Sequence, residues 1–343
     1  MNWVYNALDV LNIGDPGPLR AALVQLDGEI YADVPSAAIA TGQMFLDVLH
    51  DQTHLARGVP NLSGSHAWRI WENGFGGGGT FSGGGDAHRI DFSGGGGAIG
   101  ADRNFTPNLL GGVAVAYSHT GYGTSGISGS GGLDSVAIAS YARYAAGLAY
   151  FDGALGYSYD SARVSRTIAF PGVWGVAYGN PTDNVFLSRV EAGYRARGNN
   201  RTALTPFASF QGIVAGQNSF GESGAGAAGL NVRGVTDASA QSVLGGEVSY
   251  DLPVGFAVPL SLSARAGWAH DFADVSRGIT AGLQGTPDAN FTVSGARWPR
   301  DAAAVEARAA LTSQQTDLFI RYDGLLAEGA SINSATAGLR LAF

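Results

Sequence analysis

Several residue types that would mark familiar kinds of site are missing from this 343-residue sequence. It has no cysteine, which excludes disulfides, thiolate nucleophiles and thiolate-bound metals. It has no lysine either, so a phosphate-loop lysine and Schiff-base chemistry are excluded. The net charge of −8 argues against nucleic acid as a partner.

Charge of either sign is scarce. Charged residues make up 14% of the chain, whereas a soluble domain usually has about 25%. This deficit suggests that much of the surface does not face water. Yet the sequence has no run of about 18 apolar residues, which excludes transmembrane helices. Low charge without such a run is typical of a membrane β-barrel, because each of its strands has one apolar face.

The first 64 or so residues differ from the rest of the chain and indicate helix. The clearest helix is expected within residues 33–60, with Asp33 as its N-cap and Gly58 and Pro60 ending it. Its roughly 24 residues would extend about 36 Å, slightly more than a hydrocarbon core. A polar stripe follows one side of it and consists of Ser36, Gln43, Asp47, His50, His54 and Arg57. Such a helix could thread a polar pore, and an ordinary surface helix is the alternative.

Twelve candidate strands follow in residues 61–343, separated by Gly, Asn, Asp, Ser and Pro. They cover residues 66–81, 87–105, 108–121, 133–146, 148–160, 183–198, 202–216, 240–252, 260–272, 301–313, 316–329 and 332–343. Four longer segments, 121–133, 161–182, 218–238 and 274–300, are expected to be outer loops that alternate with short periplasmic turns.

Residues alternate within these strands between an apolar face and a polar one. Charges of both signs recur on the polar face, which we expect to line a lumen. The expected lumen-facing charges are Arg189, Glu191, Glu247, Arg265, Glu306, Arg308, Arg321, Asp323 and Arg340. We expect them to pair with one another or with Asp47 and Arg57 of the helix, because unpaired buried charges are costly. A soluble sandwich could also alternate, but aromatic residues near the strand ends favour a membrane barrel.

Motifs for catalysis and metal binding are weak. His50 and His54 could place two imidazoles on one helical face, but a zinc protease would have Glu where Asp51 stands, and no third ligand is evident. The glycine runs at 76–79 and 94–97 lie within candidate strands, and no Gly-x-Ser-x-Gly motif is present. We therefore expect no catalytic residues, no metal and no cofactor.

Four stretches taken together resemble a known family. Residues 22–52, with Leu26, Gly28 and Glu29, are similar to a Leu-x-Gly-Glu segment that leads into a pore helix. Residues 68–85 resemble that family's first strand, 94–120 its second hairpin and 319–343 its closing hairpin. The family is the C-terminal translocator domain of type Va autotransporters, the type V secretion proteins of Gram-negative bacteria.

The resemblance implies an all-β transmembrane barrel of twelve antiparallel strands in the bacterial outer membrane, with an N-terminal helix threading its lumen. It implies that residues 1–32 are a passenger remnant or linker, 33–60 the pore-threading helix and 61–343 the barrel. The implied function is to anchor in the membrane and support export of an N-terminal passenger to the cell surface. The implied partners are outer-membrane lipid and lipopolysaccharide, the barrel assembly machinery and a passenger absent from this sequence, and we expect a monomer.

The last strand has a special place in this interpretation. The resemblance implies that the assembly machinery recognises this strand. Its outward-facing Leu339, Leu341 and Phe343 would be the recognised residues, because an unpaired edge strand invites β-augmentation. They could also be merely lipid-facing residues.

Three matters remain open at this point. Some members of the family cut their linker at an Asn-Asn pair inside the barrel, but here Asn199-Asn200 is expected in a turn, so self-cleavage is not expected. Residues 1–20 do not have the pattern of a signal peptide, so we expect the sequence to be a fragment of a longer protein. A porin-like channel for small solutes and a soluble β protein that binds ligands through its loops are the alternative functions.

Overall fold

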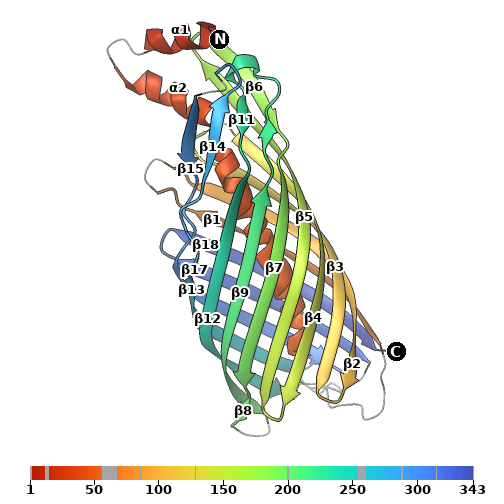
Figure 1. Ribbon diagram of the computed structural model, residues 1–343. Coiled ribbons are helices and arrows are strands. Elements are labelled where there is room, and N and C mark those ends of the chain that lie inside the picture. The colour runs from red at the N-terminus through yellow and green to blue at the C-terminus, as the bar shows by residue number, and fades with distance from the viewer. Residues whose placement is uncertain are drawn as a thin grey trace.

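In the computed structural model, three helices precede a tall β-barrel, and the third helix runs through the barrel (Figure 1). The structure describes residues 2–11, 15–55, 68–84, 87–127, 129–198, 201–253, 260–286, 289–313 and 315–342. The helical elements are α1 (Asn2–Leu11), α2 (Gly17–Asp27), the 3-10 helix η1 (Glu29–Asp33) and α3 (Val34–Leu55). No helix in the described part of the chain is long and apolar enough to span a membrane.

The barrel wall has twelve long strands within the described residues, as the sequence predicts. They are β1 (Arg69–Phe81), β2 (Ile90–Thr106), β3 (Leu109–Thr124), β4 (Gly129–Ala146), β5 (Ala149–Phe170), β7 (Thr182–Tyr194), β9 (Thr202–Gln217), β12 (Val235–Leu252), β13 (Leu260–Asp271), β16 (Asp301–Thr312), β17 (Thr316–Ala327) and β18 (Ala330–Ala342). Each is antiparallel to its neighbours, and β18 closes the barrel on β1, from Arg69 opposite Ala342 to Phe81 opposite Ala330.

The two faces of the wall follow the period-two alternation of the sequence. Large apolar side chains cover the outside, and Leu155 and Ile320 are 66% and 63% exposed. The main hydrophobic cluster lies inside, where α3 packs against the inward-facing side chains of the wall. An apolar exterior around a filled interior is the arrangement that a membrane barrel requires.

The two ends of the barrel differ. At the lower end in Figure 1 the strands are joined by short turns, such as the one at Gly147 between β4 and β5. At the upper end the wall is uneven, because β5 has 22 residues and β16 has 12. Helices α1 and α2 also lie at the upper end (Figure 1). In outer-membrane barrels the long connections lie outside the cell and the short turns face the periplasm.

The four segments expected to be outer loops are more ordered than predicted. The 121–133 segment is mostly a continuation of β3 and β4, and 161–182 completes β5 and adds β6 (Val173–Gly179). The other two segments contribute a second sheet in the order β10-β11-β14-β15. Its strands are β10 (Phe220–Gly221), β11 (Leu230–Val232), β14 (Gly278–Leu283) and β15 (Asn290–Ser294), and the 3-10 helix η2 (Gly226–Ala228) lies in the same region. A further short strand, β8 (Ala196–Arg197), pairs with β9 at the lower end of the barrel. We call the upper sheet, β6 and η2 the upper lobe.

Candidate functional site

The most distinctive feature of the molecule is α3 inside the lumen. The upper half of this helix is apolar and small, and Ala37, Ala38 and Ile39 are fully buried. Gly42 lets the helix lie against β7, because a Cβ at that position would come within 2.6 Å of Leu187 Cδ2. The upper half of α3 is therefore held by close packing.

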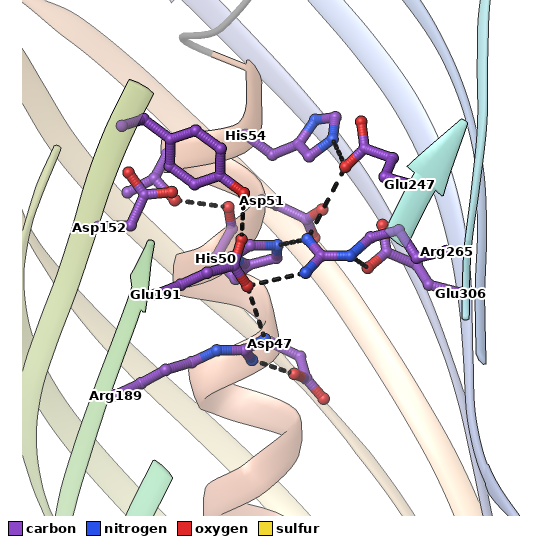
Figure 2. A network of polar contacts seen from close by, with 12 residues as sticks. Asp47, His50, Asp51, His54, Asp152, Arg189, Glu191, Glu247, Arg265 and Glu306 are labelled. Atoms are coloured by element: carbon purple, nitrogen blue, oxygen red, sulfur yellow. Dashed lines mark hydrogen bonds and ion pairs between the residues drawn. The ribbon is translucent and has the colours of Figure 1, made fainter. Parts of the chain in front are cut away.

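The lower half of α3 is held by ion pairs and hydrogen bonds to the wall (Figure 2). Asp47 Oδ1 lies 2.7 Å from Arg189 Nη1. One turn further along α3, His50 Nε2 accepts a 2.6 Å hydrogen bond from Arg265. After another turn, His54 Nε2 lies 3.1 Å from Glu247 Oε2. This series of residues makes one side of the helix complementary to the charges of β7, β12 and β13.

Arg265 is the centre of this network (Figure 2). Its guanidinium lies 2.8 Å from Glu191, 3.6 Å from Glu306 and 3.9 Å from Glu247, on three other strands. Glu247 and Glu306 directly face Arg265 across the sheet, so the strand register itself assembles the cluster. Because opposite charges are close in a buried place, the cluster joins four strands to the helix.

A second polar side of α3 faces β16, β17 and β18. Asp51 lies 2.8 Å from Arg321 and 3.5 Å from Arg308. The Arg340 side chain donates to the main-chain and side-chain oxygens of Gln52 at 2.9 and 3.1 Å. The sequence pattern did not predict that Asp51 and Gln52 contact the wall, because the predicted polar stripe covers one side of the helix. The signal was present, because Asp51 and Gln52 put polar groups on other sides of the helix than His50, but it indicates wall contacts only where the wall encloses the helix.

The structure brings most of the predicted site residues together. All nine predicted lumen charges face inward, and they are Arg189, Glu191, Glu247, Arg265, Glu306, Arg308, Arg321, Asp323 and Arg340. Gln43 borders a residual cavity of about 90 Å³ between α3 and the wall. Leu339 and Leu341 face outward at the lower end of β18. Arg57 and Phe343 lie outside the described residues.

One group of side chains has the composition of a metal site. The ligand atoms of His50, Asp152 and Glu191 lie within 4.8 Å of one another. Each of them is engaged by neighbours, however. Arg265 donates to His50 and Glu191, Tyr150 also donates to Glu191, and Arg143 donates to Asp152. With two arginines in that position, the arrangement is an ion-pair network and would repel a cation.

The chain just before α3 is bound to the upper lobe by a buried cluster around Glu222. Arg166 donates twice to this carboxylate at 2.6 Å, and Tyr31 donates to it at 2.7 Å. Arg166 also donates to the Gln25 carbonyl at 2.6 Å. Residues 25–31 are thereby fastened to β5 and the upper lobe, so the chain enters the lumen from a fixed place.

Two carboxyl groups in this entry segment have pKa values above their usual range. Burial raises the pKa of Asp27 to about 6 and that of Asp33 to about 7. Asp33 Oδ1 accepts a 3.0 Å hydrogen bond from the Ala296 amide, while Oδ2 has no partner among the described residues. Docking of this segment to the lobe should therefore depend on pH.

Comparison with known proteins agrees with this architecture. A sequence model of the autotransporter beta-domain family matches residues 70–323. The structure is similar to the translocator domain of the autotransporter NalP from Neisseria meningitidis, with a TM-score of 0.69 and 16% identity, covering 92% of this chain and 99% of that one. It is also similar to the beta domain of the Bordetella autotransporter BrkA, with a TM-score of 0.60 and 17% identity, covering 81% of this chain and 100% of that one.

A third similar structure is the transport unit of AIDA-I from Escherichia coli, with a TM-score of 0.56 and 13% identity, covering 85% of this chain and 98% of that one. A search of curated protein sequences finds no match. The family match covers well over half of the chain, and the fold agrees with it. This chain belongs to the autotransporter beta-domain family and is a translocator barrel of the bacterial outer membrane.

Proposed function

We propose that this barrel carries a passenger attached before residue 1, and that α3 is the part of the exported polypeptide that stays in the pore. One observation carries the proposal. The chain leaves the upper end at η1, passes through the lumen as α3, and then becomes the wall at β1 (Figure 1). Because the long connections of outer-membrane barrels are extracellular, everything before α3 would lie outside the cell.

The packing of α3 supports a second role for it, as a seal. Its upper half excludes water by close apolar contact, and its lower half matches the charges of the wall. A porin-like channel would need an open lumen, and the cavity of about 90 Å³ beside α3 is far smaller than that. The 343-residue chain in a planar bilayer should therefore conduct weakly, and deletion of residues 28–57 should raise the conductance.

The other partners are proposed from surface features. The outward apolar band would contact outer-membrane lipid and lipopolysaccharide, and Leu339 and Leu341 at the end of β18 would be read by the barrel assembly machinery. We propose a monomer that acts as a transport and anchoring domain and has no catalytic step. If the leucines carry a signal, a Leu339→Asn/Leu341→Asn variant should assemble less barrel than a matched Leu318→Asn/Ile320→Asn variant of the neighbouring strand.

The test of the main proposal is the side of the membrane on which the N-terminus lies. An epitope at the N-terminus should be recognised by antibody on intact bacteria. A second epitope in the turn at residues 147–148, at the lower end, is the control and should be recognised only after the outer membrane is opened. An N-terminal epitope that stays hidden until lysis would contradict the export role.

A further inference from the structure

The upper lumen contains two buried carboxylates that differ from the ion-paired carboxylates of the lower lumen. Asp160 on β5 and Asp183 on β7 directly face each other across the sheet. Both point into the lumen, and their residues are 1% and 0% exposed. Side chains at directly opposed positions have Cβ atoms about 4.5–5.5 Å apart. The two carboxyl groups are therefore close neighbours in a place that water does not reach.

In the lower lumen, buried carboxylates lie against arginine. Examples are Asp51 with Arg321, Glu191 with Arg265 and Asp152 with Arg143. Among the described residues, no arginine or histidine forms an ion pair with Asp160 or Asp183. A nearby carboxylate, Asp237 on β12, adds further negative charge. Burying like charges together is unfavourable unless a cation or a proton compensates them.

The polar atoms around the pair are also unsatisfied. Both carboxylate oxygens of Asp183 have no hydrogen-bond partner among the described residues. Gln217 on β9 directly faces Asp183 from the other side. It is 3% exposed, and neither its amide oxygen nor its amide nitrogen has a partner in the described chain. Ser158 donates to Asp160 and completes a group of oxygen-bearing side chains.

We propose that Asp160, Asp183 and the Gln217 amide oxygen bind a calcium ion that joins β5, β7 and β9 at the upper end of the lumen. Calcium prefers six to eight oxygen ligands in flexible geometry, which suits carboxylates and an amide presented by three adjacent strands. Magnesium requires a stricter octahedron of oxygens and gives up its water reluctantly. The site lies at the upper end of the lumen, which the proposed function places toward the cell exterior, where weaker, millimolar calcium sites are usual.

The experiment uses the full chain refolded in detergent that contains no lipopolysaccharide, which would itself bind calcium. The unfolding temperature is read from boiled and unboiled gel mobility in millimolar CaCl₂, in MgCl₂ and in EDTA. The wild type should unfold at a higher temperature in CaCl₂ than in EDTA, with a smaller effect of MgCl₂. The Asp160→Asn/Asp183→Asn variant should lose this response, and the matched variant Asp91→Asn, an exposed residue paired with Arg89, should keep it.

Binding is measured directly with Tb³⁺, a luminescent substitute for Ca²⁺, by exciting nearby aromatic residues such as Tyr122, which lies near Asp183. Ca²⁺ should displace Tb³⁺, and Gln217→Leu, which keeps both charges and should fold, should weaken Tb³⁺ binding by on the order of tenfold.

Two results would overturn the proposal. One is a wild-type unfolding temperature that is equal in CaCl₂ and EDTA but changes with pH, which would mean that the two carboxyls share a proton. The other is Tb³⁺ binding that is unchanged in the double Asn variant.

Discussion

The upper and lower halves of α3 are bound to the same wall by different forces. The upper half, from Val34 to Leu46, packs mostly small and apolar residues against the wall, and its hydrogen bonds to surrounding side chains are few in the described chain, such as those of Ser36 and Thr41. The lower half, from Asp47 to His54, contacts arginines and acids of β4, β7, β12, β13, β16, β17 and β18. Close packing fixes the position of the upper half and excludes water. Charge pairing in the lower half leaves a lining that water could solvate whenever the helix is absent, as a polypeptide pore requires.

The largest effect should come from the centre of the ionic half. Arg265→Ala would remove the guanidinium that Glu191, Glu247 and Glu306 share. Breaking one side of a buried ion-pair network costs about 3–5 kcal/mol, so the barrel should unfold at a clearly lower temperature in the gel-mobility assay. Arg163→Ala, at a position exposed on the outer face, is the control and should unfold like the wild type. Equal unfolding temperatures for Arg265→Ala and the wild type would contradict the role of the cluster.

A smaller effect is expected in the packed half. Gly42→Leu would place its Cβ near Leu187 Cδ2, and overpacking of this kind costs about 1–3 kcal/mol. The variant should push α3 away from β7 and increase bilayer conductance. A second change, Leu187→Ala, should restore part of the lost stability because it opens space at the contact. If the double variant is no better than Gly42→Leu alone, α3 does not approach β7 as described.

The docking of the entry segment before α3 should weaken as the pH rises, because Asp33 then loses its proton. The raised pKa of Asp33, about 7 when buried, means that the docked state binds the proton more tightly than the unfolded state. Docking of residues 15–33 should therefore weaken as the pH rises from about 4 to about 7. The rate of limited proteolysis of the entry segment, measured as a function of pH, reports this weakening. Asp33→Asn keeps the shape without the charge, and cleavage of that variant should depend less on pH. An identical pH profile for the variant would assign the effect to another group.

Much of the fold could be predicted from the sequence, since period-two alternation fixes which residues face lipid. For example, Leu318, Ile320 and Tyr322 alternate with Arg321 and Asp323, and the structure places them on the expected faces. The number of barrel strands and the helix in the lumen were predicted and are confirmed.

Other features of the structure could not be predicted from the sequence, because they depend on strand register and tertiary contacts. Asp160 and Asp183 are 23 positions apart in the sequence and face each other because of the register of β5 and β7, which alternation alone does not specify. The upper lobe was predicted as loops because its strands β10, β11, β14 and β15 are two to six residues long and gain order from each other. The contacts of Asp51 and Gln52 with the wall could be predicted only for a helix that is enclosed on all sides.

The central claim is that α3 occupies the lumen of the barrel in the membrane. The chain has no cysteine, so a single engineered pair can test this claim in intact outer membranes. Thr41 Oγ1 on α3 and Thr120 Oγ1 on β3 lie 2.9 Å apart, so Thr41→Cys/Thr120→Cys should form a disulfide under mild oxidation. The control pair Thr41→Cys/Ser93→Cys places the second cysteine on the outer face of β2 and should not form one. A disulfide in the first variant alone is the result we predict; no disulfide in either, with both proteins inserted as heat-modifiable barrels, would contradict the occupied lumen.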